Sequence, residues 1–258
     1  MKAFRIILLL CVFFFVAFYT KLQRLESMAW TDTLSVLIYP INGDGTSVTS
    51  QYIAQLSKKN ISAVDEFFKR QWGIYNEFDF TPVELSLQSE VMSQPPEPPV
   101  NGSTLSVIFW SLRLRLWAYQ HSVSTDKSNI NIFVRFHQVD ANKPLAHSLG
   151  LQKGLIGVVN GYASAAHQGH NNVVIAHELL HTVGASDKYD LVTGQPIYPN
   201  GFARPDNNYN QSKAEIMAGK IPLNAAESVM AQSLRECIIG DKTATEIGWI
   251  STLIDADQ

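Results

Sequence analysis

The 258-residue sequence predicts an α+β fold, with an α/β-like upper lobe and a small, irregular C-terminal lobe that ends in a helix. Three observations lead to this expectation. Over residues 30–184, apolar runs of strand length alternate with segments of helical periodicity, as in a mixed sheet covered by helices. Residues 191–212 are rich in glycine, proline and asparagine, which predicts a long irregular loop. Residues 225–239 then show an apolar helical pattern, so we place a lower lobe at 185–258.

Composition allows a globular domain with a sizeable core. Hydrophobic residues make up 46% of the chain, and the net charge is -3 without a basic block. Nucleic acid is therefore not an expected partner. The two cysteines, Cys11 and Cys237, are too few for a disulfide framework. We expect Cys237 to be a core residue on an apolar helix face.

The sequence of residues 1–25 is typical of a signal-anchor or a signal peptide. A basic head precedes the apolar run Ile6–Tyr19, and Lys21 and Arg24 follow it. The run is short for a membrane span of about 17–25 residues, but no clear small-residue cleavage site follows it. We therefore expect first a membrane-anchored protein whose remaining chain is exported to the periplasmic or extracellular face. Cleavage and secretion come second, and a buried core helix is a third reading.

The first half of the upper lobe contains two predicted strands and one predicted helix. Residues 34–41 form an apolar run typical of a strand that is buried on both faces. Residues 47–72 carry a 3.6-residue apolar stripe, with an interruption near Asn60. Residues 80–87 alternate as a second strand. The proline-rich segment 93–102 is interpreted as an exposed insertion within one domain.

The second half leads to the central motif. We interpret residues 104–120 as a helix, although 112–116 also alternates like a strand. Two further strands are predicted at residues 130–136 and 155–164. The last of them runs into the following helix, so it is either an ordinary edge strand or an edge that pairs with an extended peptide.

The motif H-E-x-x-H lies in the apolar segment 173–184. On a helix, His177 and His181 project from one face, so both imidazoles can bind one zinc ion. Glu178 is then placed to take the proton of a zinc-bound water. Asn171 or Asn172 is the predicted N-cap of this helix.

Three downstream residues extend the motif. Gly184, three residues after His181, can end the helix in a left-handed conformation and turn the chain back toward the metal. Asp187 follows after three more residues, and a catalytic zinc site needs three protein ligands and one open position. Met217 then follows the irregular loop, within residues 215–219.

Together these residues resemble the metzincin zinc metallopeptidases, whose signature is H-E-x-x-H-x-x-G-x-x-H with a later methionine turn. His177, Glu178, His181 and Gly184 match the signature. Asp187 stands where histidine is usual, which is similar to the snapalysin branch. The resemblance covers residues 171–190 and 215–219 only.

The resemblance implies a zinc-dependent endopeptidase acting on peptide or protein substrates. It implies a zinc-binding lobe with a mixed sheet and an active-site helix. It also implies zinc ligation by His177, His181 and Asp187, with Glu178 as general base and Met217 as a hydrophobic floor. Tyr189 or Tyr162 could donate a hydrogen bond to the oxyanion.

Several alternatives stay open. Asp190 is a second candidate for the third ligand, while His167 and His170 are interpreted as solvated loop residues. A gluzincin-type site would take Glu227 from the predicted helix 225–239. A rival of another class is a catalytically degenerate, membrane-anchored binding protein, against which the intact Glu178 argues. A membrane-anchored scaffold without metal is a further possibility.

Overall fold

The computed structural model describes residues 29–99, 102–123, 129–140, 145–151 and 155–250. The predicted signal-anchor at 1–25 lies outside these ranges. None of the helices within them combines the length and the apolar character that a membrane crossing requires.

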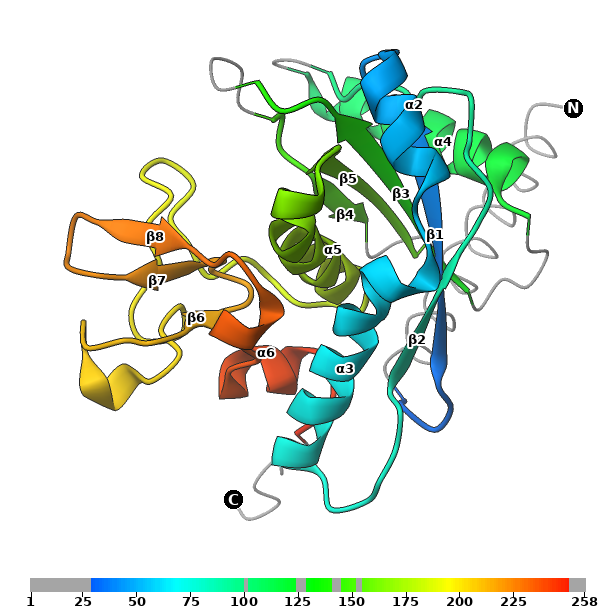
Figure 1. The fold of residues 1–258 in the computed structure, drawn as a ribbon. Helices are drawn as coiled ribbons and strands as arrows, with labels where there is room; N and C mark the ends of the chain where they lie inside the picture. Colours follow the sequence, from blue (N-terminus) through cyan, green and yellow to red (C-terminus); the bar gives the residue numbers. More distant parts are fainter. Residues whose placement is uncertain (1–28, 100–101, 124–128, 141–144, 152–154, 251–258) are drawn as a thin grey trace, which may run out of the picture.

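A five-stranded, mostly parallel sheet forms the centre of the fold, as the mixed α and β pattern predicts (Figure 1). Its strand order is β2-β1-β3-β5-β4. Four strands are parallel, and β4 alone runs antiparallel, beside β5. The bounds are Leu34–Asn42 for β1, Val83–Leu87 for β2, Ile130–His137 for β3, Leu149–Leu151 for β4 and Ile156–Tyr162 for β5.

The expectation that the strand at 155–164 forms the sheet edge is wrong. β4 covers the outer side of β5, with Gly150 paired to Gly157. β4 has only three residues, which are too few to show the alternation of apolar and polar side chains that identifies a strand in a sequence. Among the described residues, β4 therefore forms the edge of the sheet on this side.

Helices cover both faces of the sheet, because its central strands are apolar on both sides. Helices α3 (Lys58–Tyr75) and α5 (Gln168–Thr182) pack on one face and bury the larger core. Helix α4 (Thr104–His121) packs on the opposite face, where Trp117 meets Phe133. Figure 1 shows α5 in front of the sheet and α4 behind it.

The helical segment predicted at 47–72 is two helices. α2 (Ser47–Ala54) ends before the break, and Ser57 begins α3 in a capping box with Asn60. The Asn60 side chain accepts a hydrogen bond from the Ser57 amide at 2.9 Å. The interruption predicted near Asn60 is therefore confirmed, between Ala54 and Lys58. The helix predicted at 104–120 is confirmed as α4.

The C-terminal lobe consists of short strands and turns around one short helix. β6 pairs with β9, and β7 pairs with β8. The bounds are Ala214–Glu215 for β6, Lys220–Pro222 for β7, Ser228–Met230 for β8, Cys237–Ile238 for β9 and Asp241–Glu246 for helix α6.

The helix predicted at 225–239 is wrong. This segment contains β8, a single 3-10 turn and β9. The Asn224 side chain accepts hydrogen bonds from the Ala226 and Glu227 amides, so it closes a hairpin turn where the helix was expected. Cys237 is fully buried, as predicted, but in a strand.

Candidate metal centre

Helix α5 carries the H-E-x-x-H motif and is anchored near its start by two asparagines. It begins at Gln168 rather than after Asn171 or Asn172, so the predicted N-cap is wrong. Asn171 instead exchanges two hydrogen bonds of 2.9 Å with the backbone of Tyr162 at the end of β5. Asn172 donates to the Asn60 carbonyl at 2.9 Å. These buried amides join α5 to β5 and α3.

A glycine turn returns the chain to the end of α5. The helix stops at Thr182, and Gly184 has φ 108°, in the region that favours glycine. The Ala185 amide donates to the Leu180 carbonyl at 3.0 Å, which fixes the turn. Asp187 then lies beside the two histidines of the motif.

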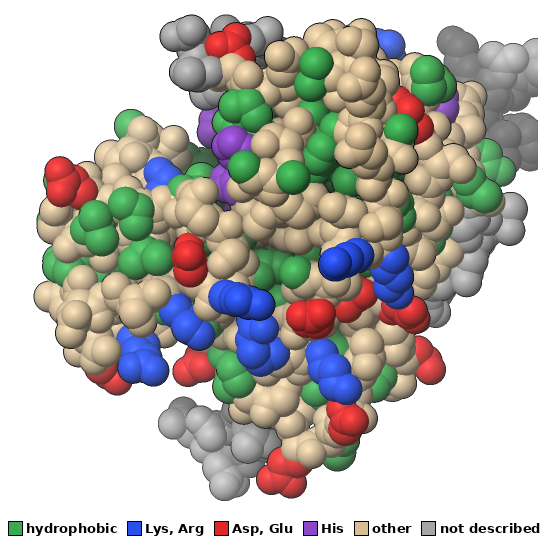
Figure 2. Space-filling model, viewed as in Figure 1, with side chains coloured by type: hydrophobic (Ala, Val, Ile, Leu, Met, Phe, Trp, Pro, Cys, Tyr) green, Lys and Arg blue, Asp and Glu red, His purple; other side chains and the backbone are tan. Residues whose placement is uncertain are grey.

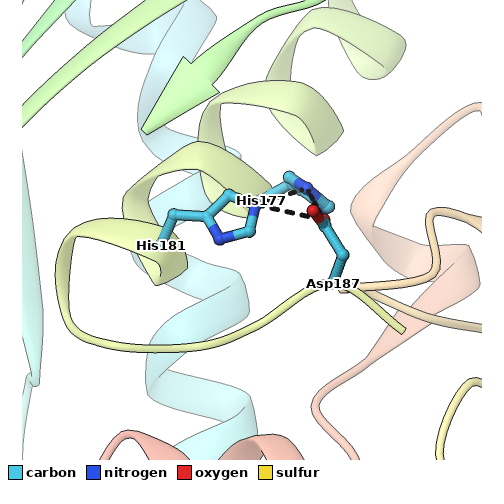
Figure 3. Close-up of side chains that lie close together, drawn as sticks. All are labelled: His177, His181 and Asp187. Atoms are coloured by element: carbon cyan, nitrogen blue, oxygen red, sulfur yellow. Dashed lines mark hydrogen bonds and ion pairs between the residues drawn. The ribbon is translucent and has the colours of Figure 1, made fainter. Parts of the chain in front are cut away.

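The three side chains converge on one point (Figure 3). The Nε2 atoms of His177 and His181 are 3.1 Å apart, and they lie 3.2 and 3.1 Å from Asp187 Oδ1. The two Nδ1 atoms face the carbonyl oxygens of Ile216, at 3.0 Å, and Ala185, at 2.9 Å. Because a carbonyl only accepts hydrogen bonds, each Nδ1 carries the proton. In the neutral form of each ring, Nε2 then keeps the lone pair that a metal ion would take.

These residues could bind a metal ion, and their spacing fits a tetrahedral one. Ligand atoms about 2.0–2.1 Å from a tetrahedral zinc lie about 3.3 Å from one another. Burial disfavours a charge on His177, but the hydrogen bond with Asp187 and the charge of Glu178 overcome it and raise the His177 pKa to about 9. Burial likewise opposes the charge of Asp187, yet both histidines hold its pKa well below the usual range. The cluster therefore attracts positive charge.

Glu178 is a buried carboxylate beside this cluster. It is only 5% exposed, and its Oε2 has no hydrogen-bond partner among the described residues. Burial raises its pKa, and the charges of His177 and His181 oppose this shift. Strand β4 packs directly against it, since a Cβ on Gly150 would lie 3.1 Å from Glu178 Oε2. An unsatisfied buried oxygen here can take up a proton.

A turn at residues 215–219 supports the first histidine. Ile216 provides the carbonyl for His177, and Met217 is fully buried next to it in sequence. The Met217 carbonyl accepts from the Lys188 amide at 3.0 Å. The turn therefore contacts both α5 and the segment that carries the third candidate ligand.

The carboxylate of Glu215 organises this turn. One oxygen accepts from the amides of Met217 at 2.6 Å and Ala218 at 3.1 Å. The other accepts from the Gly240 amide at 3.2 Å and the Thr243 hydroxyl at 2.7 Å. Sequence reasoning did not identify this role, and the only local signal is an acidic residue between apolar neighbours.

A buried ion pair supports Asp187, the third candidate ligand, in the same way. The Lys188 ammonium donates to Glu246 Oε2 at 2.7 Å and to the Ser186 carbonyl at 2.7 Å. The Ser186 amide donates to the same carboxylate at 2.9 Å. Helix α6 thereby holds the residues on either side of Asp187. The sequence gives no signal for this pair, because its partners are far apart along the chain.

Of the two tyrosines, only Tyr189 lies at the cluster. Its ring centre is 6.5 Å from that of His177. Burial and the charges of Asp187 and Glu178 raise its pKa, so its hydroxyl remains a hydrogen-bond donor. Tyr162 instead packs against His167, with ring centres 4.7 Å apart.

The other candidate ligands lie outside the cluster. Asp190 is exposed and accepts from the Val192 and Thr193 amides. Glu227 is exposed in the hairpin turn between β7 and β8. His170 belongs to α5 rather than to a loop. Within the described residues, only His177, His181 and Asp187 form a group that could hold a metal ion.

Figure 2 shows histidine side chains gathered where the C-terminal lobe meets the lobe that contains the sheet. Comparison with known proteins finds no family that matches the chain and no curated protein similar to it in sequence.

Proposed function

We propose that this protein is a zinc-dependent endopeptidase of the metzincin type, with an aspartate as its third ligand. One observation carries the proposal. Two imidazole nitrogens and a carboxylate oxygen converge within 3.2 Å, next to a buried carboxylate, one oxygen of which has no hydrogen-bond partner in the described part of the chain. A site built only to stabilise the fold does not require Glu178.

The donor set supports zinc as the metal. Two histidine nitrogens and one carboxylate oxygen are typical ligands of catalytic zinc, which keeps a fourth position open. Structural zinc sites are usually closed by four protein ligands. When bound, zinc supplies Lewis acidity, which acidifies a water molecule and polarises a carbonyl group.

The protein residues would perform the proton transfers. Glu178 accepts a proton from the attacking water and passes it to the leaving amine. Burial raises the pKa of Glu178, which favours the protonated state from which it then donates to the leaving amine. Tyr189 supplies a hydrogen-bond donor for the negative oxygen that develops on the substrate. The Ile216 and Ala185 carbonyls hold His177 and His181 in the ligating tautomer.

The free edge of β4 supports a peptide as the substrate. An extended peptide can add to such an edge through main-chain hydrogen bonds, which demand little of its sequence. Gly150 brings this edge close to α5, because a Cβ there would lie 2.6 Å from the Glu178 carbonyl oxygen and 2.6 Å from His181 Cβ. A peptide aligned on β4 would thus run beside the proposed general base.

The N-terminal sequence supports an exported, membrane-anchored enzyme. The apolar run Ile6–Tyr19 would hold the peptidase at the periplasmic or extracellular face, and cleavage after it would release a secreted form.

Replacement of Glu178 with Gln tests the proposal, because it keeps the shape of the side chain and removes the base. The wild-type chain should bind one zinc and cleave a peptide library, and a chelator should abolish the cleavage. E178Q should keep the zinc and lose about 10²–10⁴-fold in kcat. E227Q removes an exposed carboxylate from the same chain and serves as the matched control. Wild-type turnover in E178Q, or a wild-type protein that binds no zinc, would refute the proposal.

A further inference from the structure

Helix α4 has one apolar face that packs on the sheet. Leu114, Trp117 and Ala118 are buried in the smaller core. Trp110 packs against the same core, and its indole donates to the Pro96 carbonyl at 2.8 Å. All four of these residues lie on the side of α4 that faces the sheet.

The outer face of α4 is also apolar. Leu105, Phe109, Leu112 and Leu116 follow a helical period, and 52–67% of each residue's surface is exposed. Tyr119 continues the stripe and is 77% exposed. A helix on the surface of a soluble domain normally presents polar side chains here. We call these five residues the outer stripe.

The charge on α4 is exclusively positive. Arg113 and Arg115 are its only charged side chains, apart from a histidine at its end. At 100° per residue they project about 80° to either side of the outer stripe. Neither forms an ion pair with a carboxylate among the described residues. Apolar residues flanked by unpaired basic ones are the pattern of a helix that lies in a membrane interface.

The size of the stripe argues against a second copy of the chain as its partner. The stretch from Leu105 to Tyr119 spans about 22 Å, and one helix face is about 10 Å wide, which gives about 220 Å². A stable interface buries about 800 Å² on each partner. A lipid surface needs no such area when a second anchor is present, because the two attachments act together.

The second anchor is the N-terminal signal-anchor proposed above, and the present inference rests on it. The apolar run predicted to enter the membrane ends at Tyr19, and the described chain begins at Ala29. The intervening residues reach at most about 35 Å when fully extended, so the domain would stay close to the bilayer.

We propose that the outer stripe of α4 docks on an anionic phospholipid bilayer, with Arg113 and Arg115 contacting lipid phosphates. Because α4 and α5 cover opposite faces of the sheet, docking would leave the metal centre facing away from the lipid (Figure 1).

A fluorescent label on the stripe tests this inference without any use of the metal. The full chain would carry Cys11→Ser and Leu112→Cys, and Cys237 is fully buried, so the new thiol takes the environment-sensitive dye. The protein is reconstituted into phosphatidylcholine vesicles with or without phosphatidylglycerol. Val192→Cys, at a position that is 93% exposed, is the matched control.

The label at residue 112 should show blue-shifted emission, quenching by lipids with a doxyl group on the acyl chain, and protection from iodide. The label at 192 should show none of these effects. Phosphatidylglycerol should strengthen the doxyl quenching at 112, and the double variant R113Q/R115Q should remove that gain. A label that iodide quenches freely would overturn the proposal. Protection from iodide without doxyl quenching would also overturn it, because a second copy or residues 1–28 would then cover the stripe.

Discussion

Glu215→Gln should weaken metal binding although residue 215 is not a ligand. The Glu215 carboxylate holds the turn that presents the Ile216 carbonyl to His177. The glutamine has nearly the same shape, but it replaces one acceptor oxygen with an NH₂ group. The perturbation is therefore confined to the hydrogen bonds of the turn.

The magnitude follows from the four donors that face Glu215. In the best orientation, the amide oxygen still accepts from Met217 and Ala218, and the Thr243 hydroxyl rotates to accept from the NH₂ group. The Gly240 amide then lacks a partner, which costs about 1–3 kcal/mol. Loss of an outer partner of a ligating histidine typically lowers metal affinity about 10–100-fold, so we expect a change in this range.

Two measurements separate the effect of E215Q on protein stability from its effect on zinc binding. Denaturation with urea in the presence of a chelator gives the stability of the metal-free protein, and competition with a chromogenic chelator gives the zinc Kd. E227Q, with its exposed carboxylate, should match the wild type in both. If E215Q loses stability but binds zinc with the wild-type Kd, the turn does not position His177 and the reasoning fails.

Four further substitutions test the packing and the charges described above. Gly150→Ala should destabilise the protein by about 1–3 kcal/mol, because its Cβ would lie 2.6 Å from His181 Cβ. Gly73→Ala, with open space in helix α3, should stabilise it by about 0.5–1 kcal/mol in the same urea titration. Glu246→Gln leaves the buried Lys188 without its counter-charge, at a cost of about 3 kcal/mol. The carboxyl at 246 loses solvation by burial, but the hydrogen bonds of Lys188 and its neighbours lower its pKa below the ordinary 4.5. The stability gap to the wild type should therefore be full above pH 4.5 and shrink as the pH falls through the lowered value. An equal gap at all pH values would contradict this. Asp187→Ala should bind less than one zinc in equilibrium dialysis, and unchanged stoichiometry would place the third ligand elsewhere.

The elements that could be predicted from the sequence are those whose environment is uniform along their length. β1 and β5 are buried on both faces along most of their length and therefore appear as largely apolar runs. In β3 the half-buried positions Asn131, Arg135 and His137 are polar, and the residues between them are apolar. The segment 225–239 shows the opposite case. Val229 and Met230 are exposed, whereas Leu234 and Cys237 are buried, so its helical spacing arose from separate short elements.

The same distinction applies to the metal centre. The spacing of His177 and His181 and the glycine before Asp187 are local features, and from them the sequence predicts that the three residues lie close together, as they do. The residues that fix their orientation are not local. Neither the Thr243 hydroxyl at Glu215 nor the Glu246 carboxylate at Lys188 can be inferred from neighbouring sequence.

Both of these contacts come from α6, which therefore links the two halves of the metal centre. Thr243 reaches the turn behind His177, and Glu246 reaches the segment around Asp187. Residues just after the helix attach it to the upper lobe. The ring of Trp249 lies 5.4 Å from that of Trp30, whose indole donates to the Ile247 carbonyl at 2.6 Å.

This connection makes the docking of α6 and the binding of metal thermodynamically linked. If docked α6 aligns the ligands, it raises metal affinity by a fixed factor. By reciprocity, bound metal must stabilise the docked state of α6 by the same free energy. The affinity of the candidate metal centre should therefore depend on the C-terminal lobe as well as on the H-E-x-x-H helix.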